Sequence, residues 1–169
     1  MQGERKFPEA ADVFAQVKGP PAFEVRAAAA ELQCLADTLT NAPKDADKAW
    51  ADPLRARAAR AHDRFQRVAA NAKSGATPEL RARVTLSKAM SESAGPSPPL
   101  AQSLETLKDF EKRYPGATDL HLLAGALRLL LPLLPWLHPP SVLLVSPAFL
   151  QLGLLHALAA SSLNFCLVG

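Results

Sequence analysis

Charged residues stop abruptly near residue 120, and this break limits what the chain can fold into. The sequence has 169 residues with 19 Lys+Arg and 16 Asp+Glu, and only one of these charges, Arg128, lies after residue 119. The last fifty residues include nineteen leucines. A chain whose preference for water changes this sharply has two parts with different physics. We predict a polar helical domain over 1–119 and an apolar Leu/Pro-rich tail over 120–169.

Helix start and stop signals divide the first part into short segments. Proline after a capping residue marks a helix start, and Gly-Pro or Asn-x-Pro marks an end. Asp52-Pro53 and Thr77-Pro78 are such starts, and Gly95 is a break. No segment alternates with the period of a strand. The predicted helices cover about 7–18, 22–40, 53–74, 78–93 and 98–114, and a sixth begins near Thr118 and runs into the tail.

These helices predict an all-α fold of antiparallel pairs. Their apolar stripes are thin and rich in alanine, as in the helix that carries Val25, Ala28, Leu32 and Leu35. Each helix therefore buries little by itself and must pack against the next pair to offset its ordering entropy. The alternatives are a helix-pair solenoid and a helical bundle.

Two segments resemble helices of the tetratricopeptide-repeat (TPR) family. In the first, Phe7-Pro8-Glu9-Ala10 is followed by apolar residues four and seven positions after the alanine. In the second, which ends in Phe-Glu-Lys-Arg-Tyr-Pro-Gly, a small residue, an apolar pair and a closing proline follow the same order. The resemblance implies a solenoid that binds partners on a concave face, and no chemistry. The repeat-packing residues that it implies are Phe7, Ala10, Phe14, Val17, Ser103, Leu107, Phe110 and Pro115.

Patterns for catalysis, cofactors and metals are missing from the sequence. It lacks a phosphate-binding glycine loop, a Gly-x-Ser-x-Gly elbow and a His-Glu-x-x-His pair. Cys34 and Cys166 lie far apart and show neither disulfide nor metal spacing. His62 and Asp63 lie on an arginine-rich helix, where we expect both to be solvated. We predict that the chain is not an enzyme and binds no cofactor, metal or small-molecule substrate.

The strongest charge feature is a run of five arginines at residues 55, 57, 60, 64 and 67. Arg60, Arg64 and Arg67 fall on one face of a helix and could bind phosphate or an anionic lipid. The competing interpretation is an ordinary exposed face opposite the Ala58–Phe65–Val68 stripe. The aromatic residue among the arginines, Phe65, belongs to the opposite apolar stripe, so we expect none on the arginine face. Acidic residues also offset the arginines, and both points argue against nucleic acid as a partner.

Three interpretations of the tail are open. Residues 141–169 contain no charge, and 148–169 would give about 33 Å of helix, enough to span a membrane. The tail could instead pack against the first part, or it could be a non-native sequence from a shifted reading frame or a truncated gene. The N-terminus lacks the apolar run of a secretory signal, so we expect a cytoplasmic body.

The sequence predicts an interaction protein. The first hypothesis is an adaptor of helical repeats that binds a protein partner and is held at a membrane by its C-terminus. The second is a small membrane protein in which the C-terminal helix or hairpin is the functional element.

Overall fold

The computed structural model describes residues 6–133, and these residues form helices and no strand. The all-α prediction is therefore confirmed for this part of the chain. The elements are α1 (Phe7–Gln16), α2 (Pro21–Thr40), α3 (Lys48–Ala69), the short 3-10 helix η1 (Ala72–Ser74), α4 (Pro78–Ser93), α5 (Leu100–Leu107), α6 (Phe110–Arg113), α7 (Thr118–Leu130) and a second 3-10 turn, η2 (Leu131–Leu133).

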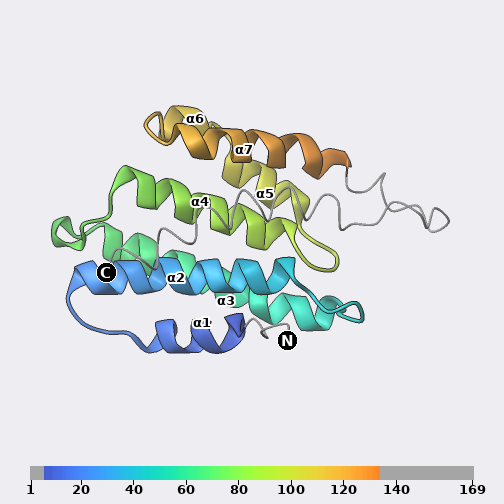
Figure 1. Ribbon diagram of the computed structural model, residues 1–169, viewed down its shortest axis with the longest axis horizontal. Helices are drawn as coiled ribbons and strands as arrows, with labels where there is room; N and C mark the ends of the chain where they lie inside the picture. Colours follow the sequence, from blue (N-terminus) through green and yellow to red (C-terminus); the bar gives the residue numbers. More distant parts are fainter. Residues whose placement is uncertain (1–5, 134–169) are drawn as a thin grey trace, which may run out of the picture. The chain divides into compact units, whose positions relative to one another are not determined.

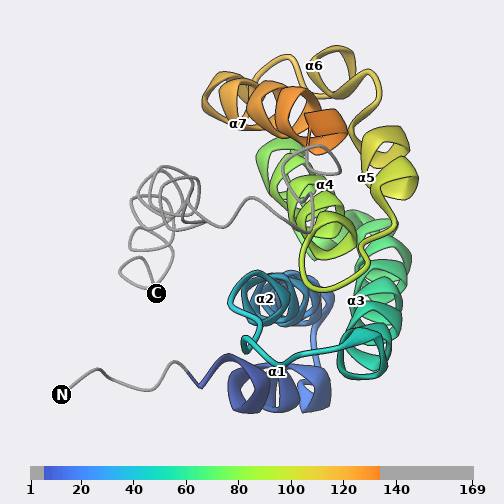
Figure 2. The ribbon, with the colours of Figure 1, turned by 90° about the vertical axis from the view of Figure 1, so that its right-hand side faces the viewer.

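The helices stack in sequence order, with α2 and α4 at the centre. α2 packs against α1, α3 and α4, and α4 packs in turn against α5 and α7. Figure 1 shows α2, α4 and α7 running in one direction, with α1 and α3 antiparallel to them. Viewed from the side, α1, α2, α4 and α7 form one row, and α3 and α5 form a second beside it (Figure 2).

Small side chains allow these helices to approach closely. The cluster shared by α1, α2, α3 and α4 contains six alanines together with Leu32, Leu35 and Phe65, all three fully buried. Alanine costs almost no side-chain entropy when it is buried, but it removes little apolar surface from water. The thin stripes predicted from the sequence therefore become close helix contacts, and the few large side chains fill the space between them.

The third helix begins earlier than predicted. α3 starts at Lys48, and the side chain of Asp47 caps it by accepting a hydrogen bond of 2.8 Å from the backbone N–H of Trp50. Asp52, the predicted cap, instead forms an ion pair with Arg55. Pro53 lies inside the helix and costs one backbone hydrogen bond there. Asp47 and Asp52 are both suitable capping residues, five positions apart, and the helix begins after the first of them.

The predicted helix over 98–114 is interrupted. α5 ends at Leu107 and α6 begins at Phe110, because Asp109 has the left-handed backbone conformation, with φ of 52°. Aspartate tolerates this conformation better than most residues. The turn lets Phe110 enter the interior, where its ring lies 5.1 Å from that of Tyr114 and 6.1 Å from that of His121.

The last helix crosses the expected domain boundary at residues 119 and 120. α7 buries Leu120, Ala124 and Leu127, and the compact unit to which it belongs extends to Pro132. Arg128, the one charge of the apolar part, donates two hydrogen bonds to the carboxylate of Glu111, at 2.8 and 2.9 Å. The remainder of the tail, including the proposed membrane segment 141–169, lies outside the described residues.

Close packing at Ala58 predicts that a larger side chain there is destabilising. Ala58 is 1% exposed, whereas its neighbour Ala59 faces solvent on the same helix. We expect Ala58→Leu to lower the free energy of unfolding by about 1–3 kcal/mol through overpacking. Ala59→Leu, the matched control, should change it by less than about 0.5 kcal/mol. Denaturant unfolding of the full-length protein, followed by circular dichroism, measures both, and equal effects would contradict the packing argument.

Candidate functional site

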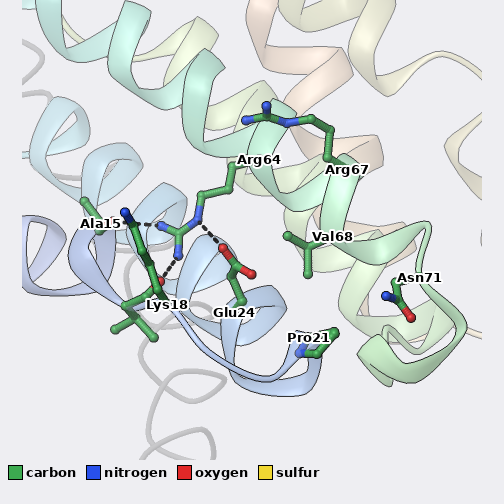
Figure 3. A pocket seen from close by; sticks show the side chains of 9 residues that line it. Ala15, Lys18, Pro21, Glu24, Arg64, Arg67, Val68 and Asn71 are labelled. Atoms are coloured by element: carbon green, nitrogen blue, oxygen red, sulfur yellow. Dashed lines mark hydrogen bonds and ion pairs between the residues drawn. The ribbon is translucent and has the colours of Figure 1, made fainter.

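A groove lies between α1 and α3, with α2 as its floor. It consists of two adjoining hollows of about 490 and 590 Å³ that share Ala15, Arg64 and Arg67. Figure 3 shows the smaller hollow, which also takes in Lys18 and Glu24. Neither hollow is lined by a serine, cysteine, histidine or aromatic residue. The lining consists of charged, amide and aliphatic side chains, and it can therefore bind charged groups.

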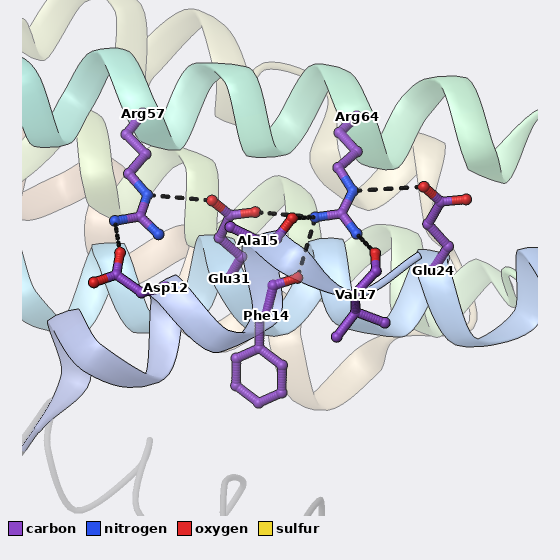
Figure 4. A network of polar contacts seen from close by, with 8 residues as sticks. All are labelled: Asp12, Phe14, Ala15, Val17, Glu24, Glu31, Arg57 and Arg64. Carbon is purple, nitrogen blue, oxygen red and sulfur yellow. Dashed lines mark hydrogen bonds and ion pairs between the residues drawn. The ribbon is translucent and has the colours of Figure 1, made fainter. Parts of the chain in front are cut away.

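Arg64 divides the groove and holds the end of α1. Its guanidinium donates to the backbone oxygens of Phe14 and Ala15 at 3.2 Å and to that of Val17 at 2.6 Å (Figure 4). These carbonyls belong to the last turn of α1, which has no basic residue of its own. A cation at this position supplies donors to carbonyls at the end of the helix and opposes the negative end of the helix dipole.

Glu31 of α2 connects Arg64 to a second arginine. Its carboxylate is almost fully buried and accepts hydrogen bonds of 3.3 Å from both Arg64 and Arg57. Arg57 also donates to Asp12 of α1. Burial lowers the pKa of Arg57, but the hydrogen bonds and charges of Asp12 and Glu31 outweigh it, so its pKa lies above the ordinary value. The network joins α1, α2 and α3 across the floor of the groove.

The three arginines predicted as an anion-binding face therefore divide into two kinds. Arg64 is occupied by the end of α1 and by Glu31, so it is a structural residue and not an open anion site. Arg60 and Arg67 are exposed, line the groove, and form no side-chain hydrogen bond or ion pair within residues 6–133. Lys18, which the sequence did not single out, is a third such cation at the groove.

Other arginines cap helix ends as Arg64 does. Arg55 donates to the oxygens of Ala94 and Pro96 beyond α4, at 2.8 and 2.7 Å. Arg81 donates to Ala69 at the end of α3, and Arg113 donates to Thr106 and Lys108 where α5 ends. Sequence reasoning missed this use, because it depends on which helix ends lie beside which arginines. The last turns of α1, α4 and α5 have no basic residue, but that of α2 has none either, so this absence alone could not have identified the helices that receive an arginine.

The residues expected from the TPR resemblance lie in two different settings. On α1, Phe7, Ala10, Phe14 and Val17 are half-buried, and the fully buried alanine is Ala11. In the second segment Leu107 and Phe110 are fully buried. Ser103 is also buried there and donates a hydrogen bond of 2.8 Å to the backbone oxygen of Ala89 on α4. Pro115 is exposed.

Comparisons with protein-family models, with curated proteins and with solved structures found no match for this chain. Among residues 6–133, no helix is both long and apolar enough to cross a membrane. The same residues contain no cluster of three or more histidine, cysteine or acidic side chains that could hold a metal ion.

The two kinds of arginine should respond differently to the same substitution. Lysine keeps the charge but cannot reach three carbonyls and a carboxylate at once. We expect Arg64→Lys to lower the free energy of unfolding by about 1–3 kcal/mol. Arg67→Lys, one turn further along α3, should change it by less than about 0.5 kcal/mol. Thermal and denaturant unfolding of the two variants tests this, and comparable losses would show that Arg64 is not a cap.

His62 predicts how stability depends on pH. The sequence predicted that His62 and Asp63 are both solvated. Asp63 is strongly exposed, but the side chain of His62 is only 15% exposed. Its Nε2 lies 3.1 Å from the side-chain nitrogen of Gln66 and can accept a hydrogen bond from it when the ring is neutral. Burial, together with the charge of Lys88, lowers the pKa of His62 below its ordinary value of 6.5, against the opposing effect of Asp63.

The folded state therefore binds a proton at His62 less readily than the unfolded chain does. Its full contribution to stability is present above about pH 6.5 and is lost as the pH falls from there through the lowered folded pKa. We expect a lower melting temperature at about pH 5.5 than at about pH 7.5, with a slope of at most about 1.4 kcal/mol per pH unit. His62→Gln should reduce this difference. An unchanged difference would assign the pH dependence to other groups.

Proposed function

We propose that residues 6–132 form a non-catalytic module that binds another polypeptide, with the groove between α1 and α3 as its docking surface. The observation that carries this proposal is the state of the charges in the groove. Asp12, Glu24 and Glu31 face arginines of α3, while Lys18, Arg60 and Arg67 have no partner within the described residues.

The construction of the groove favours binding over catalysis. Its walls are whole helices, fixed to one another by Arg57, Arg64 and Glu31, so that its shape is set before a partner arrives. A preformed surface costs less ordering entropy on binding. The stacked helix pairs also suit a helical-repeat adaptor of the TPR kind, or a helical bundle with the same role.

Attachment to a membrane through residues 141–169 stays a prediction from the sequence, since that segment has no charged residue. It would place the module at a membrane surface without changing the groove. The alternative, in which the C-terminal segment is itself the functional element, makes the module a passive appendage. The two proposals differ in whether the groove is occupied in the cell.

Site-specific photo-crosslinking measures that occupancy. A benzophenone amino acid replaces Gln16, an exposed residue of the groove, or Ala59, which is exposed on α3 and lines neither hollow. In cells that make the full-length protein, we expect discrete, protease-sensitive adducts from position 16 and none of the same mass from position 59. Absence of a polypeptide adduct at position 16, or the same adducts at both positions, would refute the proposed function.

A further inference from the structure

The partner of the groove can be specified further from its charges. We propose that the groove binds an extended acidic peptide segment, in which two carboxylates three residues apart pair with Arg60 and Arg67. This inference rests on the proposed function, because it names the chemistry of the polypeptide that would occupy the same groove.

The unpaired positive charge in the groove indicates that the partner is negatively charged. Its lining has five cationic side chains, Lys18, Arg57, Arg60, Arg64 and Arg67, and three acidic ones, Asp12, Glu24 and Glu31. Arg57 and Arg64 face all three acids. The remaining three cations line the hollows and form no ion pair within the described residues, so their charge is available to a molecule that enters the groove. A carboxylate suits an arginine well, because the planar guanidinium can donate two parallel hydrogen bonds to it.

Spacing along α3 sets the form of the partner. Arg60 and Arg67 are seven residues apart on one helix face, which is about 10 Å along the axis. In a polyproline II segment, residues i and i+3 lie on the same side, about 9 Å apart. This conformation makes no internal hydrogen bonds, so its backbone N–H groups are free to donate to the carboxylate of Asp12. An acid-x-x-acid segment therefore matches the two arginines.

Nucleic acid fits the same surface less well. Proteins that bind single strands stack the bases on aromatic side chains, and no aromatic residue lines either hollow. Asp12 on a wall and Glu24 on the floor would also repel a run of phosphates, while they leave room for the isolated charges of a peptide. The arrangement favours a few carboxylates over a continuous anionic backbone.

Binding of two labelled peptides to the full-length protein, measured by fluorescence anisotropy, tests the inference. One peptide carries the core Glu-Ser-Pro-Glu and the other Gln-Ser-Pro-Gln. We expect the Glu peptide to bind at least about fivefold more tightly, with a difference that shrinks as salt is added. The double substitution Arg60→Gln/Arg67→Gln should weaken binding of the Glu peptide by about five- to thirtyfold. Neither arginine has an intramolecular partner in the described part, so we expect the fold to persist, as circular dichroism checks.

A matched control removes two charges elsewhere. Arg26 and Lys44 are exposed and line neither hollow, so Arg26→Gln/Lys44→Gln should leave the affinity within about twofold. Equal binding of both peptides, equal loss in the control, or tighter binding of an oligouridylate that depends on Arg60 and Arg67 would each overturn the acidic-peptide inference. If crosslinking at position 16 still yields a polypeptide, the proposed function survives that failure.

Discussion

The last turn of an α-helix leaves carbonyl groups without donors and carries partial negative charge. A chain built from many short helices has many such ends, and each needs donors or positive charge from elsewhere. In this body α1, α4 and α5 have no basic residue in their last turns, and each receives an arginine from another part of the sequence. Two of these arginines, Arg55 and Arg64, come from α3, which thereby ties the end of α1 to the segment that follows α4. The caps fix where each helix ends relative to α3. The groove between α1 and α3 exists because Arg64 joins its two walls at one point and leaves space on either side.

Thin apolar stripes explain why polar contacts have such weight here. An alanine-rich interface removes little apolar surface from water, so each helix contact contributes a modest free energy. Hydrogen bonds inside these interfaces then become significant, because a buried polar group without a partner costs about 1–3 kcal/mol. Ser87 of α4 donates to Gln33 of α2 at 2.6 Å, and Thr85 pairs with the hydroxyl of Tyr114 at 2.8 Å. These bonds select one alignment of α2, α4 and the segment after α5, where alanine alone would tolerate several.

Local sequence signals predict where the helices lie but not which contacts their side chains make. Proline after a capping residue and apolar periodicity locate most helix starts, since both act within a few residues. They could not decide between Asp47 and Asp52 as the cap of α3, because both obey the same local rule and tertiary packing chooses. The left-handed turn at Asp109 could not be predicted from the sequence pattern either, because the helical spacing of apolar residues continues across it. At the groove, the sequence showed that arginines share a face. Which of them is occupied depends on the end of α1, almost fifty residues away from Arg64.

Composition and folding divide this chain at different places, and α7 shows why. Loss of charge near residue 120 marks a change in solvent preference, yet α7 has one side against α4 and α5 and shares the compact unit that extends to Pro132. Its single arginine forms an ion pair with Glu111 of α6, so this charge has an acidic partner although no acidic residue follows Asp119 in the sequence. The opposite side of the helix carries Leu122 and Leu129, which are 82% and 74% exposed. A helix that is apolar on both sides looks from composition like the start of the tail, whereas its buried stripe makes it the last layer of the body.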